Sequence, residues 1–70
     1  MIERNYSVAG MHCASCVALI RDEVGELDGV ESVDVDLERG RMTVRYDDAR
    51  VPEARILEAV GEAGYSATPE

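Results

Sequence analysis

Apolar and polar residues alternate along this chain with two different periods. Every second residue is apolar over residues 33–37 and 41–46, and residues 2–8 follow the same rule apart from Arg4. A period of two is typical of a strand with one buried face and one solvated face. We therefore predict strands over these three segments and a short last strand over residues 65–68.

Between these segments the apolar spacing lengthens to three or four residues. This spacing covers residues 15–27 and 53–63, and it predicts two amphipathic helices. Gly29, after Asp28, suits the left-handed turn that ends the first helix. Pro52 suits the first position of the second helix, and Gly64 suits its C-terminal cap.

The resulting order is strand-helix-strand-strand-helix-strand. It predicts an α+β fold of the ferredoxin-like βαββαβ type, in which one four-stranded antiparallel sheet carries both helices on a single face. The 70 residues make one domain, 1–70, near the lower limit of what folds without disulfides or metals. Such a thin core has no room for a deep, enclosed substrate cavity of roughly 300 Å³ or more, so we do not expect an enzyme.

The charge balance narrows the choice of partners. Fifteen acidic residues face seven basic ones, all arginine, for a formal net charge of −8. Such a surface repels nucleic acid and anionic lipid, so we expect neither as a partner. There is no run of 18 apolar residues and no signal-peptide pattern at the N-terminus, so we expect a cytoplasmic protein without membrane insertion.

The candidate chemistry lies in a loop where the first strand gives way to the first helix, and we expect this loop to be exposed at the surface. The segment Gly10-Met11-His12-Cys13-Ala14-Ser15-Cys16 holds both cysteines and the only histidine. In a reducing compartment such a pair is more often a metal site or a redox dithiol than a structural disulfide. The positive end of a helix stabilises thiolates, and thiolates select Cu(I), zinc or iron–sulfur clusters.

The number of ligands separates these metals. Structural zinc and iron–sulfur clusters each need four ligands, whereas this chain offers Cys13, Cys16 and at most His12. Cu(I) accepts two or three sulfur ligands, so we predict Cu(I) as the metal, with Ag(I), Hg(II) or Zn(II) as alternatives in vitro. A dithiol oxidoreductase is the less favoured reading, because the chain has no Trp and neither of its prolines lies near the cysteine pair.

The cysteine segment resembles the Gly-Met-Thr-Cys-x-x-Cys signature of the heavy-metal-associated domain family. The similarity runs from Ile2 to about Ala67, and it includes the turn Leu27-Asp28-Gly29-Val30 and the ending Ala63-Gly64-Tyr65. This family comprises copper chaperones, N-terminal metal-binding domains of copper-transporting P-type ATPases, and mercury-binding proteins. The resemblance implies a Cu(I) carrier that passes its ion to a partner by exchanging thiolate ligands one at a time.

The resemblance also implies roles for the neighbours of the cysteines. Met11 would turn inward beneath the loop, although its thioether is an alternative ligand. Tyr65 would lie beside the metal loop and shield it, by similarity to bacterial members; the alternative is an ordinary tyrosine at the edge of the core. His12 stands where the family usually has Thr, and it is either a solvent-facing loop residue or an auxiliary ligand that tunes metal release. Cys13 would meet the thiol of a partner first.

The function expected from the sequence is therefore that of a cytosolic copper chaperone. Its partner would be a copper-transporting P-type ATPase or another copper-accepting protein. The alternatives are the N-terminal metal-binding domain of such an ATPase and a mercury-binding protein. We expect a monomer without metal, while a dimer bridged by Cu(I) through both cysteine pairs is a second possible state of the loaded protein.

Overall fold

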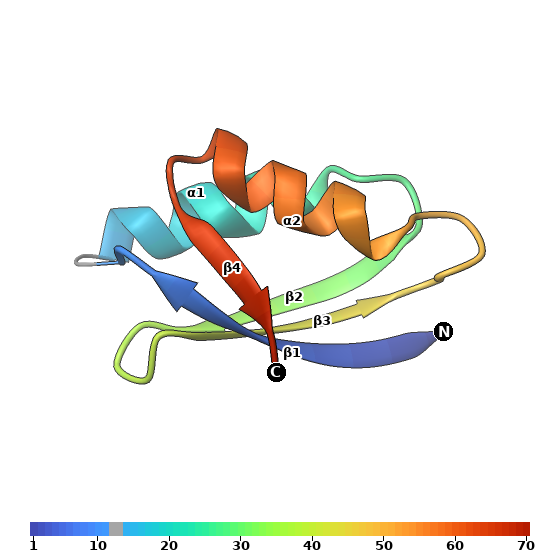
Figure 1. Cartoon of the computed structure of the whole chain (residues 1–70). Coiled ribbons are helices and arrows are strands. Elements are labelled where there is room, and N and C mark those ends of the chain that lie inside the picture. The colour runs from blue at the N-terminus through green and yellow to red at the C-terminus, as the bar shows by residue number, and fades with distance from the viewer. Residues whose placement is uncertain (12–13) are drawn as a thin grey trace.

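The computed structural model describes residues 1–11 and 14–70. Its elements follow the predicted order: β1 (Ile2–Ala9), α1 (Ala14–Gly25), β2 (Val30–Asp36), β3 (Arg41–Tyr46), α2 (Glu53–Glu62) and β4 (Ser66–Pro69). The strands form one sheet in the order β2-β3-β1-β4, and each neighbouring pair is antiparallel. Both helices cover the same face of this sheet (Figure 1). The predicted ferredoxin-like sandwich is confirmed.

The hydrophobic core fills the space between the sheet and the two helices. The strands and helices contribute to it the residues at the apolar positions of their periodic patterns. The largest fully buried side chains are those of Tyr6, Tyr46, Ile20, Met42, Ile56, Val24, Val44 and Val60. Full burial of a Val, Ile or Met side chain stabilises the fold by about 1.5–3 kcal/mol relative to leaving it exposed. Among the described residues, no charged side chain is buried.

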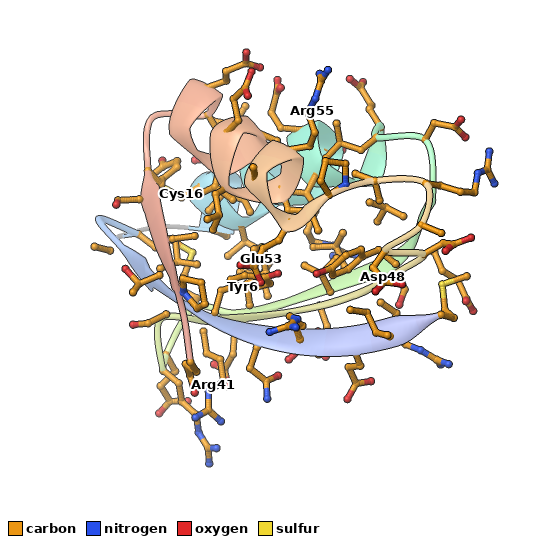
Figure 2. The ribbon with its side chains drawn as sticks, turned by 45° about the vertical axis from the view of Figure 1, so that its right-hand side comes forward. Tyr6, Cys16, Arg41, Asp48, Glu53 and Arg55 are labelled. Carbon is orange, nitrogen blue, oxygen red and sulfur yellow. The ribbon has the colours of Figure 1, made fainter. Side chains whose placement is uncertain are left out.

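A hydrogen bond under α2 joins that helix to the central strand β1. The Tyr6 hydroxyl donates to Oε2 of Glu53 at 3.2 Å, and the same carboxylate oxygen lies 3.6 Å from Nε of Arg4. Burial, followed by the neighbouring Tyr46 and Glu53, raises the pKa of Tyr6 above its usual range, so the hydroxyl keeps its proton and remains a donor. Tyr6 and Glu53 lie together at the base of the helix layer in Figure 2.

Strand β2 begins three residues earlier than the alternation predicts. Val30 pairs with Tyr46 whereas Ser32 pairs with Arg45, so Glu31 is an extra residue in a β-bulge. The bulge lets Val30 and Val33 share the inner face although they are three positions apart. A prediction based on a strict period of two therefore stops short of Val30.

Pro52 lies one position before the place predicted for it. It is the N-cap of α2, with an extended backbone (φ −73°, ψ 151°), and the helix begins with Glu53. The carbonyl of Pro52 accepts the N–H of Arg55 at 3.0 Å. The acidic Glu53 still occupies the first turn, where the helix dipole favours a negative charge.

The turn before β2 provides a test of the fold. Gly29 has φ +105°, and a Cβ at this position would lie 3.0 Å from Cβ of Arg50 and 3.1 Å from Cγ1 of Val51. Gly29→Ala therefore combines backbone strain with a steric clash, and we expect it to lower the free energy of unfolding by about 2 kcal/mol or more. Urea denaturation measures this change.

Gly61→Ala is the matched control. Gly61 lies inside α2, and a Cβ there would meet nothing within 4 Å. Because alanine has the higher helix propensity, we expect this substitution to stabilise the protein by about 0.5–1 kcal/mol. Equal effects of the two substitutions would contradict the turn geometry assigned to Gly29.

Candidate metal site

The predicted metal segment, residues 10–16, follows directly after the end of β1 at Ala9, and its last three residues form the start of α1, which begins at Ala14. Two of its residues, His12 and Cys13, lie outside the described residues, so the predictions made for them are carried forward as predictions. The structure does describe Gly10, Met11 and Cys16, and it also describes Tyr65, which the resemblance places nearby. These four residues define the surroundings of the site.

Cys16 is the third residue of α1, and its side chain is only 8% exposed. Ile20 and Val24 follow it at intervals of four residues, and both are fully buried. Residues at this spacing share one face of a helix, so the helical phase directs Cys16 toward the core. The sequence interpretation of a loop-exposed cysteine pair is wrong for Cys16 for this reason.

The first turn of α1 also defines the electrostatics of the site. The first four N–H groups of any α-helix have no carbonyl partner within the helix, and they carry its positive partial charge. Cys16 lies within this turn, and α1 has no acidic residue there that would cancel the effect. A thiolate or an anionic metal–thiolate group is therefore favoured at this end of the helix.

Tyr65 is brought next to the start of the metal segment. Gly10 has φ +93°, and a Cβ on it would lie 3.4 Å from Cδ1 of Tyr65. The N–H groups of Gly64 and Tyr65 bond to the carbonyls of Gly61 and Val60 at 3.0 and 3.1 Å. This is the Schellman pattern of hydrogen bonds, and it ends α2 with the aromatic ring placed against the backbone of Gly10.

Met11 is partly buried and packs against the hydrophobic core. Its flexible thioether side chain can fill irregular space beneath a loop. This packing favours the structural reading of Met11 over a role as a sulfur ligand.

Leu19 is the residue near the site that sequence reasoning missed. It lies one helical turn after Cys16, and its large apolar side chain is 50% exposed. A signal was present in the sequence, because Leu19 falls outside the buried stripe formed by Cys16, Ile20 and Val24. It places an apolar contact surface beside the first turn of α1.

The described residues hold no competing metal centre. Within 1–11 and 14–70, no three His, Cys, Asp or Glu side chains come close enough to bind an ion together. None of the helices in this part of the chain is long and apolar enough to cross a membrane. The many acidic residues therefore do not form a site for a hard cation in the described part of the structure.

Comparison with known proteins gives a consistent picture. The sequence profile of the heavy-metal-associated domain matches residues 5–66. The copper chaperone CopZ of Enterococcus hirae is 39% identical over 66 residues, which is 94% of this chain and 96% of that protein.

Solved structures agree with the sequence matches. The copper-binding domain of HMA7, a P-type ATPase, superposes with a TM-score of 0.96 at 30% identity, covering 100% of this chain and 95% of that domain. Oxidized MerP from Ralstonia metallidurans gives 0.93 at 29% identity, covering 99% and 96% of the two chains. By its profile match, its relatives and its fold, the chain belongs to the heavy-metal-associated domain family.

Proposed function

We propose that this protein binds Cu(I) through Cys13 and Cys16 and passes it to a partner by exchange of thiolate ligands. The observation that carries the proposal is the position of Cys16 in the first turn of α1, three residues after Cys13. A Cu(I) ion held by two thiolates leaves a net charge of −1, which the positive end of α1 stabilises. The ion is the cargo of the protein, which acts as a carrier and not as an enzyme.

The two cysteines have different tasks in this proposal. Cys16 is 8% exposed and lies on the same face of α1 as the buried Ile20 and Val24, so it serves as the anchored ligand. Cys13 belongs to the segment that precedes the helix, so it serves as the ligand that meets the partner first. Transfer begins when a thiolate of the partner adds to Cu(I) and the Cys13–Cu bond breaks. A second thiolate of the partner then replaces Cys16.

This exchange involves no oxidation or reduction. Each incoming thiol loses one proton and each departing thiolate gains one, so charge and protons balance over the two steps. Leu19, half-exposed beside the first turn of α1, provides apolar contact area for the partner during the exchange.

The relatives support copper as the metal and a P-type ATPase as the partner. One is named a copper chaperone, and another is the copper-binding domain of a P-type ATPase. We propose a cytoplasmic chaperone that delivers Cu(I) to such an ATPase or to another copper acceptor. In this proposal it is monomeric without metal, and a dimer bridged by Cu(I) through both cysteine pairs is a second state of the loaded protein.

A second candidate is a metal-binding domain within a copper-transporting ATPase. The fit to the HMA7 domain over 100% of this chain favours it specifically. The length of the native reading frame separates the two candidates. The likeness to MerP makes Hg(II) a further ion to include in binding assays.

The first prediction concerns the metal ligands. In competition titrations, we expect the wild-type protein to bind Cu(I) far more tightly than Zn(II), because two thiolates match a soft monovalent ion. Replacing both ligands, as Cys13→Ser with Cys16→Ser, should weaken Cu(I) binding by at least about a thousandfold. Tight Zn(II) binding with weak Cu(I) binding, or an unchanged Cu(I) affinity in the double variant, would contradict the proposal.

The second prediction concerns His12, which enters the proposal as an auxiliary group beside the cysteine pair. Imidazole is a good ligand for copper when it is neutral. We therefore expect His12→Ala to change the Cu(I) affinity, or its dependence on pH, between pH 6 and pH 8. His12→Thr, which restores the usual residue of the family, is the matched variant. Affinities that are the same for all three proteins across this range would exclude a role for His12.

The third prediction concerns Tyr65, whose ring lies against Gly10. We propose that the ring shields the bound ion from competing ligands. Tyr65→Ala should then release Cu(I) to a chelator about threefold faster or more, because it opens the site to solvent, whereas Tyr65→Phe retains the ring. Stopped-flow transfer to a coloured Cu(I) chelator measures both rates. Equal rates for Tyr65→Ala and the wild type would remove the shielding role.

A further inference from the structure

Strand β2 is an open edge of the sheet. It pairs with β3 on one side, and among the described residues no strand lies on its other side. Such an edge carries a row of backbone N–H and C=O groups that can pair with another chain. On this edge, seven residues from Val30 to Asp36 are available, which is enough for an added strand.

The alternation of hydrogen-bonded pairs along the sheet shows which residues of β2 direct their backbone N–H and C=O groups away from β3. The N–H of Val8 donates to the carbonyl of Gly40 at 2.7 Å, which identifies Val8 and Gly40 as a hydrogen-bonded pair. In antiparallel sheets these pairs alternate, so Met42 and Val44 bond to β1 and the residues between them bond to β2. Thr43 is thus bonded to its partner Asp34.

It follows that the neighbours of Asp34 along β2 direct their backbone groups to the open side. Val33 and Val35 each offer one N–H and one C=O there, and the described part of the chain supplies no backbone partner for either residue. Because these groups are already in strand geometry, an extended chain can pair with them without rearrangement.

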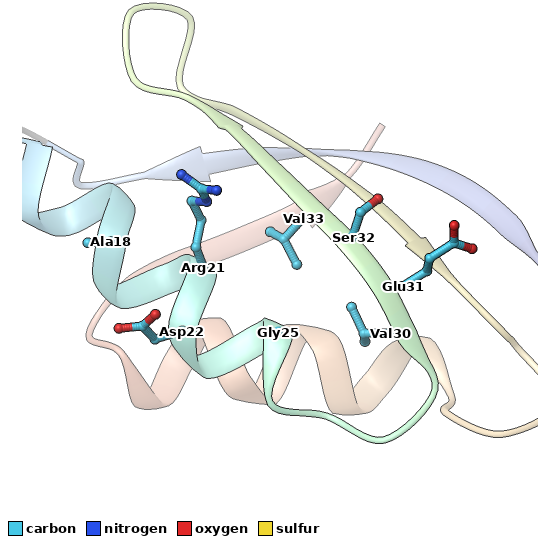
Figure 3. Close-up of a pocket in the computed structure, with 8 residues that line it drawn as sticks. All are labelled: Ala18, Arg21, Asp22, Gly25, Val30, Glu31, Ser32 and Val33. Carbon is cyan, nitrogen blue, oxygen red and sulfur yellow. The ribbon is translucent and has the colours of Figure 1, made fainter.

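A hollow of about 320 Å³ runs beside this edge, between α1 and β2 (Figure 3). Its lining combines small or apolar residues, Ala18, Gly25, Val30 and Val33, with the polar residues Arg21, Asp22, Glu31 and Ser32. A Cβ on Gly25 would meet nothing within 4 Å, so this flank of the helix leaves space. Figure 3 shows Val33 directed toward the helix and Ser32 away from it. The hollow can therefore take the inward-pointing side chains of an added strand.

The charges along the edge are predominantly acidic. Glu31 and Asp34 on β2 are exposed, and none of the ion pairs found among the described residues includes them. The exposed Asp22 lies on α1 beside Arg21, which is the only base among the described residues that line the hollow. Asp36, at the end of the strand, already faces Nε of Arg39 at 3.8 Å. Because the carboxylates of Glu31 and Asp34 have no basic partner among the described residues, a bound segment with basic side chains would be complementary to them in charge.

A second copy of this chain does not meet this requirement. Pairing β2 with another β2 would set the acidic edges, each with Glu31 and Asp34, against one another, and like charges on neighbouring strands destabilise a sheet. The other edge strand, β4, has four residues, none of them basic, and it ends in Pro69, which lacks an N–H. The occupant is therefore a segment of a different protein.

We propose that β2 and the hollow beside it bind an extended segment of another protein in which Arg or Lys alternates with apolar residues. The segment pairs with the outward backbone groups of Val33 and Val35 as a fifth strand of the sheet. Its apolar residues enter the hollow beside Val33, and its basic residues lie on the opposite face beside Asp34. The surface does not include Cys16 or the metal segment, so this binding does not depend on the proposed copper function.

The test uses the whole protein without metal and a capped probe peptide, Gly-Arg-Val-Lys-Val-Arg-Val-Lys-Gly. We expect shifts of backbone amide NMR signals in β2 and in the second half of α1, and slower hydrogen exchange at Val33 and Val35. The scrambled peptide Gly-Arg-Lys-Arg-Lys-Val-Val-Val-Gly has the same composition and charge without the alternation. It should bind at least about tenfold more weakly.

Two substitutions locate the site. Val33→Pro removes an outward N–H that the sheet itself does not use, so the fold tolerates it at an edge, but probe binding should fall by about tenfold. Val33→Thr, which keeps the N–H, is its matched control. Asp34→Arg should weaken binding by a similar factor, whereas Asp48→Arg, the same charge change in an exposed loop, should not.

Other outcomes overturn the proposal. Equal binding of the ordered and scrambled peptides, or shifts centred on the acidic outer faces of α1 and α2, would indicate nonspecific charge attraction. Concentration-dependent self-association through β2 would identify a second copy as the occupant. Cu(I) titrations of Val33→Pro should match the wild type, so a failure of the edge-strand proposal and a failure of the copper proposal are told apart.

Discussion

The structure depends on which face of α1 is turned toward the core. The same face of this helix carries Cys16 in its first turn and the fully buried Ile20 and Val24 in the next two. The cysteine is therefore positioned by the core and not by the loop that precedes it. Because the core is packed at close to crystalline density, one proposed metal ligand is held firmly while the other belongs to the connecting segment. This asymmetry suits a carrier that has to bind an ion and also release it.

The second constraint comes from the contacts at the two ends of α2. The hydroxyl of Tyr6 bonds to Glu53 in the first turn of α2, and the Schellman pattern at the far end of α2 places Tyr65 against Gly10. The two ends of α2 are thus tied to β1 and to the start of the metal segment. A short domain with a small core can in this way hold a site on its rim without disulfides.

The fold could be predicted from the sequence because the apolar periods of strands and helices are clear and the elements are short. Prediction failed where a local feature interrupts a period. Because of the bulge at Glu31, the strict alternation of apolar residues does not extend to the first residues of β2. Because Pro52 has an extended backbone, the first residue of α2 is Glu53 and not Pro52. The chemistry of the cysteines, which the sequence predicts from their spacing and from the ligand count, stays a prediction. The burial of Cys16 was not expected, since the motif was interpreted as a loop although its last residue lies on the core face of a helix.

The central claim is that Cu(I) is held by the thiolates of Cys13 and Cys16. X-ray absorption spectroscopy of the Cu(I)-loaded protein tests it most directly, because it reports which atoms surround the metal. We predict a coordination shell of two sulfur atoms, or of three ligands when an exogenous thiol or His12 joins. A shell made only of nitrogen and oxygen atoms would contradict the account.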